Sequence, residues 1–136
     1  MRIVILHFLD VENKKHSEIL KKLVDSANKN GHQVDLINGN KEYDTFRITP
    51  YEYVTVVSKG KNVFSSKVPQ KVTEVLNSCG TSSGKKACAL VLKQIFFSET
   101  LCRNLMKVLD KEGMIVDYFN VIENPDHAIH IGKKLG

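Results

Sequence analysis

The sequence predicts an α/β fold of three layers, in which helices pack on both faces of a five-stranded parallel sheet. Two phrases of similar composition predict it: Asn-Lys-Asn-Gly31-His-Gln-Val-Asp-Leu-Ile and Asp-Lys-Glu-Gly113-Met-Ile-Val-Asp-Tyr-Phe. Each follows an apolar pattern of helical spacing and precedes a short apolar run, so each glycine is expected to end a helix just before a strand. Strands that alternate with helices in this way form parallel sheets with right-handed crossovers.

The first strand is expected over residues 2–8, a continuous apolar run typical of a strand buried on both faces. Asn13 can cap a helix over residues 14–30, and Gly31 supplies its left-handed stop. The buried face of this helix is expected to carry Ile19, Leu20, Leu23, Val24 and Ala27. A second short strand over 34–37 ends at the turn phrase Asn-Gly-Asn.

The middle of the chain contains one irregular segment, residues 41–50, which we interpret as a loop because it shows no period. The third strand is expected over 53–57. Pro69 can open the next helix, and the fourth strand is expected over 87–92. The inner face of that helix comprises Val68, Val72, Val75, Leu76 and Cys79.

Two further helices and one strand complete the pattern. Ser98 is expected to cap a helix that ends at Gly113, with an apolar stripe of Leu101, Leu105, Val108 and Leu109. The fifth strand is expected over 114–119. Asn124, followed by Pro125, is expected to cap the last helix.

Length and composition indicate one globular domain over residues 1–136, with 42% apolar and 26% charged residues. The three cysteines, Cys79, Cys88 and Cys102, form no CxxC pair, which favours reduced thiols and a cytoplasmic protein. The opening apolar run, residues 2–9, lacks the length and cleavage site of a signal peptide. No run approaches the roughly 20 apolar residues of a membrane span, so we expect no membrane partner.

The net charge is +5, from twenty Lys and Arg against fifteen Asp and Glu. Such a balance is explained either by a solvated lysine surface or by a preference for anionic ligands, acidic proteins or nucleic acid. Arg47 and Arg103 are the two arginines among these cations. Base readout and bidentate phosphate binding favour arginine, so nucleic acid is the least favoured of these partners.

The order and length of the elements, with two local phrases, resemble the flavodoxin family over essentially the whole chain. One phrase runs from Tyr53 to Pro69, where Gly60, Val63 and Phe64 take places common in that family and Asn62 stands where proline is common. The other is the closing Asn124-Pro-Asp phrase with its Ile-Gly-Lys-Lys-Leu ending. The resemblance implies strand order 2-1-3-4-5 and a site for flavin mononucleotide (FMN) at the junction of strands one and three.

In flavodoxins the loop after strand one is rich in glycine and threonine, and it surrounds the phosphate. Here the corresponding stretch, 10–17, contains neither residue. Its acids Asp10 and Glu12 would oppose a phosphate, whereas its basic groups and helix amides would favour one. We therefore predict FMN binding that is weaker than in ordinary flavodoxins, or absent. The cofactor-binding candidates are Asn13, Lys14, Lys15, His16, Ser17, Gly60, Lys61, Asn62, Val63, Phe64 and Phe97.

The phenylalanines of the loops after strands three and four allow two interpretations. Phe64 and Phe97 could stack on a flavin ring, or they and Phe96 could pack beneath the loops as core residues. A further expectation concerns charge: the lysines in these loops should converge into a positive rim that attracts anions. They are Lys14, Lys15, Lys59, Lys61, Lys67 and Lys93.

Other chemistry has little support in the sequence. His127 and His130 lie three apart on the last helix but lack an evident third ligand, so we predict no metal site. His7, at the end of the first strand, is expected to pack or to cap. No Walker loop, GxSxG or GxGxxG motif is present, and we name no catalytic residue.

Three functions therefore stand as hypotheses. The first is an FMN-binding electron-transfer or redox protein with a redox partner protein. The second is a cofactor-free module of the same fold that binds an anionic ligand or an acidic protein. The third is a small reductase using flavin and a nicotinamide donor, which leaves open whether the protein is an enzyme. Fold alone does not choose among them.

Overall fold

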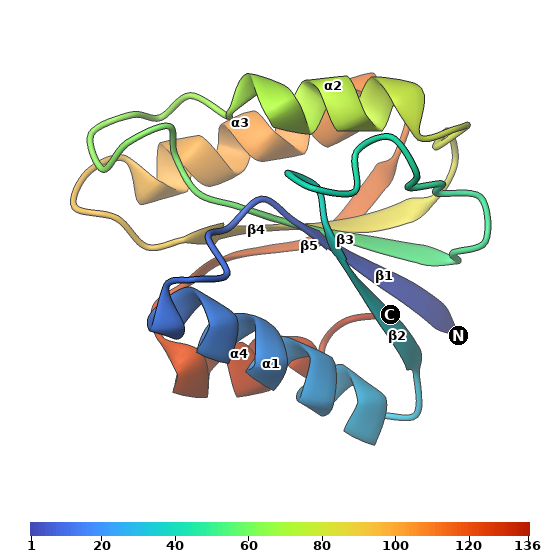
Figure 1. Ribbon diagram of the computed structural model, residues 1–136, viewed down its shortest axis with the longest axis horizontal. Helices are drawn as coiled ribbons and strands as arrows, with labels where there is room; N and C mark the ends of the chain where they lie inside the picture. The colour runs from blue at the N-terminus through green and yellow to red at the C-terminus, as the bar shows by residue number, and fades with distance from the viewer.

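The computed structural model describes residues 1–136 and contains a five-stranded parallel sheet (Figure 1). The strand order is β2-β1-β3-β4-β5, which confirms the order implied by the resemblance. The strands are β1 (Arg2–His7), β2 (Gln33–Asn38), β3 (Tyr53–Ser58), β4 (Lys86–Leu92) and β5 (Ile115–Ile122). Chain order reverses between β1 and β3, so the loops that leave these two strands flank the junction.

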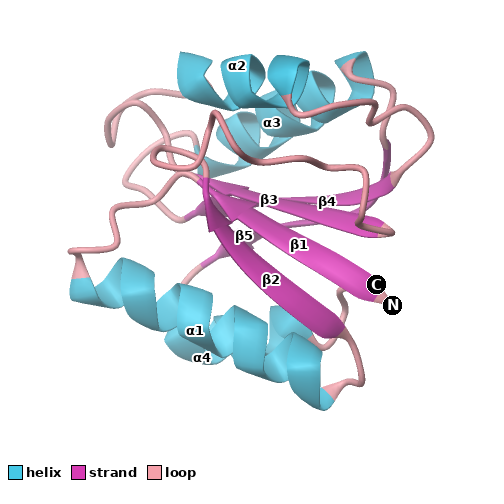
Figure 2. Ribbon diagram, turned by 45° about the vertical axis from the view of Figure 1, so that its right-hand side comes forward, coloured by secondary structure: helices cyan, strands magenta, loops and turns pink.

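Helices cover both faces of the sheet, as the sequence predicts (Figure 2). The helices α1 (Lys14–Lys29) and α4 (Pro125–Gly132) lie together on one face. The helices α2 (Gln70–Ser78) and α3 (Ser98–Lys111) lie on the other. Each face buries its own apolar cluster, of 16 residues under α1 and α4 and 20 residues under α2 and α3. No helix is both long enough and apolar enough to cross a membrane.

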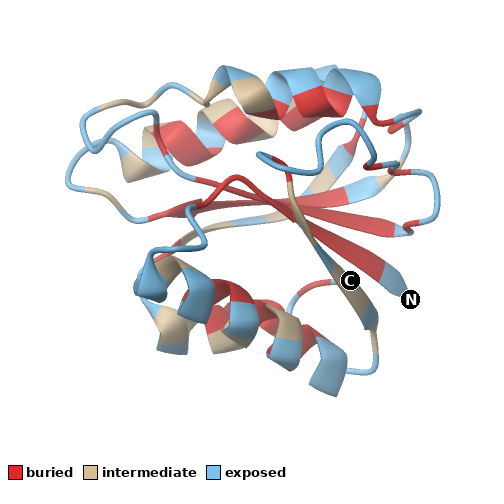
Figure 3. Ribbon diagram, viewed as in Figure 1, coloured by how far each residue is buried: buried red, intermediate tan, exposed pale blue.

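The central strands are buried on both faces, and this burial explains their continuous apolar runs (Figure 3). All six residues of β3 are buried, and so are all residues of β1 and β4 except the first of each. The two edge strands are more exposed: β2 has no buried residue, and most of β5 alternates exposed with partly buried positions. The loops that follow β1, β3 and β4 leave the buried strands at the carboxyl end of the sheet, at the left in Figure 1.

Most of the predicted helix ends are confirmed. The side chain of Asn13 accepts hydrogen bonds from the amides of Lys15 and His16, and that of Asn124 accepts one from the amide of His127. Gly31 and Gly113 adopt φ of 91° and 83°, the left-handed conformation that glycine takes at low cost. Both glycines lie at the amino end of the sheet, opposite the loops that follow β1, β3 and β4.

Two sequence predictions about boundaries are wrong. Ser98 does not cap α3: Phe97 occupies the cap position at φ 65°, and the Ser98 hydroxyl instead accepts the amide of Gln94 at 2.8 Å. The fifth strand extends to Ile122 rather than ending at residue 119, since its last residues pair with the end of β4. The polar Asn120 hid this extension in the sequence, because it interrupts the apolar run.

The edge strand β5 departs from regular pairing at one place. Its register against β4 shifts between Ala87 and Cys88, so that Asp117 lacks a partner residue. The Asp117 carboxylate accepts a 2.6 Å hydrogen bond from the hydroxyl of buried Tyr53. Further along, the amide of Val121 donates a hydrogen bond to the side chain of Asn120 at 2.8 Å.

Candidate functional site

A cleft of about 450 Å³ opens at the carboxyl end of the sheet, between the loops that follow β3 and β4 and the start of α1. In open α/β sheets this position beside the reversal of strand order is where ligands bind. The cleft is lined by His16, Lys59, Gly60, Lys61, Asn62, Val63, Leu92, Lys93, Gln94 and Ile95. None of these side chains carries a carboxylate, so the lining is neutral or basic.

The structure brings five of the predicted cofactor residues into this cleft: His16, Gly60, Lys61, Asn62 and Val63. Four others, Asn13, Lys14, Lys15 and Ser17, lie at the first turn of α1 and do not line it. Phe64 and Phe97 lie outside the lining, on the loops that form its walls. Half of the residues that line the cleft are therefore among the candidates that the sequence predicts.

The loop after β1, residues 8–13, is closed by its own hydrogen bonds. The amide of Leu9 donates to Nδ1 of His7 at 3.2 Å, and the amide of Asp10 donates to Nδ1 of His16 at 3.3 Å. The amide of Glu12 donates to the Asp10 carboxylate at 3.0 Å. Imidazole nitrogens and a carboxylate therefore take amide hydrogens that a bound anion would otherwise accept. We call residues 8–13 the closed loop.

The first turn of α1 is satisfied in the same way. Asn13 Oδ1 accepts the amides of Lys15 and His16 at 3.0 and 3.2 Å. The hydroxyl of Ser17 donates to the carbonyl of Val11 at 2.7 Å. Helix amino termini bind anions through free amides. Here a side-chain amide already uses two of these amides, and the hydroxyl faces the loop rather than a ligand.

Both histidines that accept amide hydrogens of the closed loop favour the neutral form. Burial lowers the pKa of His7 to about 4, against an ordinary value of 6.5. Burial and the positive charge of Lys59 lower the pKa of His16. An Nδ1 that accepts an amide hydrogen must be unprotonated, so hydrogen bonding and electrostatics agree. His7 packs and caps, as the sequence predicts, and it does not reach the cleft.

Gln94 joins the two loops that wall the cleft. Its side-chain amide donates to the carbonyl of Ser65 at 2.8 Å and to the carbonyl of Phe96 at 2.7 Å. Gly60 makes room for this bridge, because a Cβ there would stand 2.6 Å from Gln94 Oε1 and from the Ser65 carbonyl. A residue larger than glycine at this position would push the walls apart.

The aromatic residues of these loops face solvent. Phe64, Phe96 and Phe97 are 61%, 51% and 58% exposed, which rules out the interpretation that they pack beneath the loops. The rings of Phe64 and Phe96 stack with centroids 5.7 Å apart, and those of Phe96 and Phe97 are 6.0 Å apart. Together with Val63 and Ile95, which also line the cleft, they form what we call the aromatic face.

The predicted positive rim is present in part. Lys59, Lys61 and Lys93 line one cleft, although Lys93 also pairs with Glu123 at 3.1 Å. Lys15 contributes to the positive potential at His16, where its charge acts in the same direction as that of Lys59. The convergence therefore extends from the loop after β3 to the first turn of α1.

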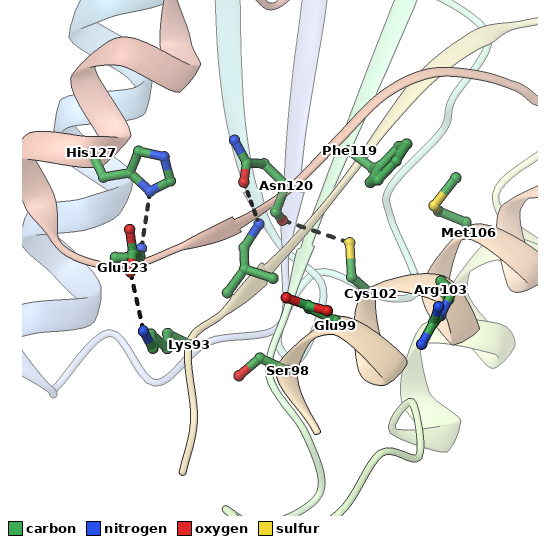
Figure 4. Close-up of a pocket in the computed structure, with 11 residues that line it drawn as sticks. Lys93, Ser98, Glu99, Cys102, Arg103, Met106, Phe119, Asn120, Glu123 and His127 are labelled. Atoms are coloured by element: carbon green, nitrogen blue, oxygen red, sulfur yellow. Dashed lines mark hydrogen bonds and ion pairs between the residues drawn. The ribbon is translucent and has the colours of Figure 1, made fainter. Parts of the chain in front are cut away.

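A larger groove, of about 760 Å³, lies along the outer edge of the sheet between β5, α3 and the start of α4 (Figure 4). Its charged groups are of both signs, and several bond to one another. Glu123 pairs with Lys93, and the amide of Glu123 donates to Nδ1 of His127 at 3.1 Å. Mixed charge and internal pairing make this groove a poorer anion site than the smaller cleft.

No group of three or more His, Cys, Asp or Glu side chains is placed to hold a metal ion. His127 uses Nδ1 to accept a backbone amide. All three cysteines are buried, and burial raises the pKa of Cys102 to about 11. At neutral pH these thiols are protonated and shielded, which is unlike a nucleophilic cysteine.

Sequence reasoning missed part of the cleft. Gln94, Leu92 and Ile95 were not among its candidates, and neither was the bridging role of Gln94. Their position at the end of β4, beside the reversal of strand order, was the one indication in the sequence that they line the cleft. Nothing in the sequence indicates the Gln94 bridge, since it depends on how closely two loops approach in space.

Comparison with solved structures shows the fold. Flavodoxin 2 from Bacillus cereus is 11% identical with a TM-score of 0.71, covering 97% of this chain and 95% of that one. Two-electron reduced flavodoxin from Megasphaera elsdenii is also 11% identical with a TM-score of 0.71, covering 96% of each. Flavodoxin from Fusobacterium nucleatum, bound to FMN, is 18% identical with a TM-score of 0.62, covering 99% of each. No protein-family model and no curated protein matches the sequence.

The chain therefore has the flavodoxin-like fold, and its residues can be tested against FMN. The cleft offers room for a flat ring, apolar contacts from Val63 and Ile95, and cations for a phosphate. The closed loop does not fit the phosphate, because the amides of Leu9, Asp10 and Glu12 are committed. The site thus fits the ring better than it fits a backbone-bound phosphate.

Proposed function

We propose that the protein is a flavodoxin-fold electron-transfer protein that takes FMN in the cleft at the carboxyl end of the sheet. The observation that carries the proposal is the cleft itself. It lies beside the reversal of strand order, it has no carboxylate in its lining, and three lysines and three apolar side chains line it. The likeness to flavodoxins along the whole chain supports the same position.

The cleft residues have distinct roles in this proposal. Gly60 and Gln94 hold the two walls at a fixed separation, and Val63 and Ile95 contact the ring. Lys59 and Lys61 attract the phosphate through their side chains, because the closed loop has no spare amides for it. When bound, the flavin supplies the redox chemistry. The protein's residues bind the ring, orient it and shield one edge from water.

Titration of the purified protein with FMN tests the proposal, with flavin fluorescence and visible absorbance as the signals. We expect saturable binding that weakens as salt rises, because exposed ion pairs are screened. The variant Gly60→Leu should abolish binding by forcing the cleft walls apart, whereas Phe119→Ser, on the far edge strand, should not affect it. No saturation at any accessible FMN concentration, with the protein shown to be folded, would contradict the proposal.

The closed loop favours a second candidate function, a cofactor-free module that binds an anionic ligand at the same lysines. A loop whose amides are satisfied internally is stable without a ligand, as such a module requires. The two candidates differ in one measurement. The electron-transfer protein binds riboflavin, which has the ring without the phosphate, whereas the anion-binding module binds inorganic phosphate and ignores riboflavin.

A further inference from the structure

We infer that the aromatic face, Val63, Phe64, Ile95, Phe96 and Phe97, is the docking surface for a partner protein whose own contact surface is apolar at its centre and acidic at its rim. The inference deepens the proposed function by naming the chemistry of the partner protein. It rests on the proposed function only in so far as the partner exchanges electrons with this protein. Docking itself can be measured on protein without flavin.

Exposure is the first argument. Eleven large apolar side chains of the chain are exposed, and these five gather on two neighbouring loops instead of being scattered. Contiguous apolar surface of this kind marks interaction sites, and aromatic residues are enriched at the centres of interfaces. Ile95, at 68%, and Phe64, at 61%, are the most exposed of the eleven.

Backbone strain is the second, independent argument. Phe97 adopts φ 65°, and no other residue except glycines has a positive φ. A bulky side chain in this left-handed conformation is an outlier that costs conformational energy, and such strain gathers at functional positions. Here the strained residue carries its ring outward, at 58% exposure, beside the ring of Phe96.

The face is also preformed. The Gln94 side chain ties the carbonyl of Ser65 to that of Phe96, so the two loops that carry the rings move together. Two further bonds brace them: the amide of Phe64 donates to Asn62 Oδ1 at 2.9 Å, and the amide of Gln94 donates to Ser98 Oγ at 2.8 Å. A preformed face lowers the entropy cost of docking.

Charge selects the partner. Lys59, Lys61 and Lys93 line the cleft that shares Val63 and Ile95 with the aromatic face, and no carboxylate lines that cleft. The chain carries a net charge of +5. An acidic rim on the partner would complement these amines and raise the rate of association, most strongly at low salt.

The same observations disfavour two other occupants. A second copy of this chain would bring lysines against lysines, and like charges across an interface are unfavourable. A membrane surface requires no fixed ring geometry, whereas the two loops that carry these rings are held by several hydrogen bonds. A protein of complementary shape and charge uses both the rigidity and the lysines.

Synthetic peptides provide the probe. The first alternates Glu with Leu and Phe, the second replaces every Glu by Lys, and the third replaces every Leu and Phe by Ser. Binding to flavin-free protein is followed by amide chemical shifts, with Phe96 and Gln94 as reporters. We expect the first peptide alone to shift these signals, with an affinity that falls several-fold as salt rises from about 0.05 to about 0.5 M.

Variants locate the contact. Phe64→Ser and Lys61→Glu should each weaken the first peptide by roughly tenfold, the loss typical of an interface anchor. Matched controls are Phe119→Ser, which is 54% exposed on β5, and Lys107→Glu on the outer side of α3, and both should bind as the wild type does. Unchanged amide spectra outside the two loops would show that each variant is folded.

Four results would overturn the inference. The first is that the acidic apolar peptide shifts no signal, and the second is that the basic peptide binds equally well. The third is that the control variants lose as much binding as the test variants. The fourth is that the aromatic face binds a membrane or a second copy of the chain. The last is checked with phosphatidylserine vesicles and with sedimentation over a concentration series. Vesicle binding or self-association that Phe64→Ser abolishes would reassign the face. Because flavin is not involved, failure here is distinct from failure to bind FMN.

Discussion

The imidazole of His16, in the first turn of α1, accepts the backbone amide hydrogen of Asp10 at 3.3 Å. This contact ties the start of the helix back to the loop that precedes it. It requires Nδ1 of His16 to be unprotonated, and it places a neutral ring where an anion would otherwise meet the amide. A phosphate at this site must therefore be bound by side chains instead of by backbone amides.

Flavins with and without a phosphate should bind with similar affinity. Exposed ion pairs contribute about 0–1 kcal/mol, so FMN should bind at most about tenfold more tightly than riboflavin, with the difference vanishing at high salt. The double variant Lys59→Ala/Lys61→Ala should reduce the affinity for FMN to that for riboflavin, whereas Lys107→Ala should leave it unchanged. Competition titrations measure both affinities. A salt-independent preference of about a hundredfold would show that the loop reopens for the phosphate.

Stability should fall in mild acid because of His7. Its pKa in the folded protein, about 4, lies below the ordinary 6.5, so folding favours the neutral ring. This contribution is complete above pH 6.5 and is lost as pH falls toward 4, with an upper limit of about 3 kcal/mol. His7→Asn keeps an acceptor for the Leu9 amide and should flatten the profile in this window. Denaturant unfolding at several pH values measures it, with His130→Asn on the surface as the control.

Thr55→Val should stabilise the protein. The Thr55 hydroxyl is fully buried in β3 and has no hydrogen-bond partner. Replacing an unpaired buried hydroxyl by a methyl group of similar size should raise the free energy of unfolding by about 1 kcal/mol or more. Thr73→Val, at an exposed position of α2, should change it little. A destabilised Thr55→Val protein would indicate a partner for the hydroxyl, such as a bound water.

Gln94→Ala should loosen the two loops without unfolding the sheet. It removes the bonds to the carbonyls of Ser65 and Phe96, each worth about 1 kcal/mol. Backbone relaxation and hydrogen exchange should show faster motion in residues 61–67 and 95–97, with strand amides unchanged. Gln70→Ala, an exposed glutamine without such bonds, is the control. Equal mobility in the two variants would mean that the bridge does not hold the loops.

Asn13→Ala should lower the free energy of unfolding by about 1 kcal/mol, the usual effect of removing a helix cap. It also frees the amides of Lys15 and His16, which the Asn13 side chain now occupies. The same variant should therefore bind inorganic phosphate more tightly than the wild type, as followed by the chemical shifts of these amides. Asn40→Ala, in the turn after β2, is the matched control. Lost stability without a gain in phosphate binding would show that the freed amides point away from the cleft.

The fold was accessible from the sequence because burial on both faces leaves a simple pattern. The runs in β1, β3 and β4 are nearly uninterrupted, and Gly31 and Gly113 mark helix ends through a conformation that few other residues adopt. The end of β5 was missed because an edge strand needs no apolar run. Ser98 looks like a cap by residue type, but its hydroxyl is used by Gln94 instead.

The site was less accessible because its details depend on contacts between loops. The basic and acidic residues of 10–17 suggested a poor phosphate site, but not that His16 and Asp10 satisfy the loop from within. The sequence around Phe64 and Phe97 would look the same if their rings were buried. Local sequence does not distinguish the two, because the direction of a loop side chain is decided by packing elsewhere.

The irregular pairing of β5 bears on behaviour in concentrated solution. An unpaired strand edge is a template to which a strand of another chain can pair. Proteins protect such edges with β-bulges or by satisfying the edge hydrogen-bond donors within the chain. The register of β5 shifts at Asp117, and the side chain of Asn120 accepts the amide hydrogen of Val121. Replacing Asn120 by an apolar residue would return that donor to the surface beside exposed Phe119 and Ile115. Strand addition between molecules, and with it aggregation, would then have a starting point.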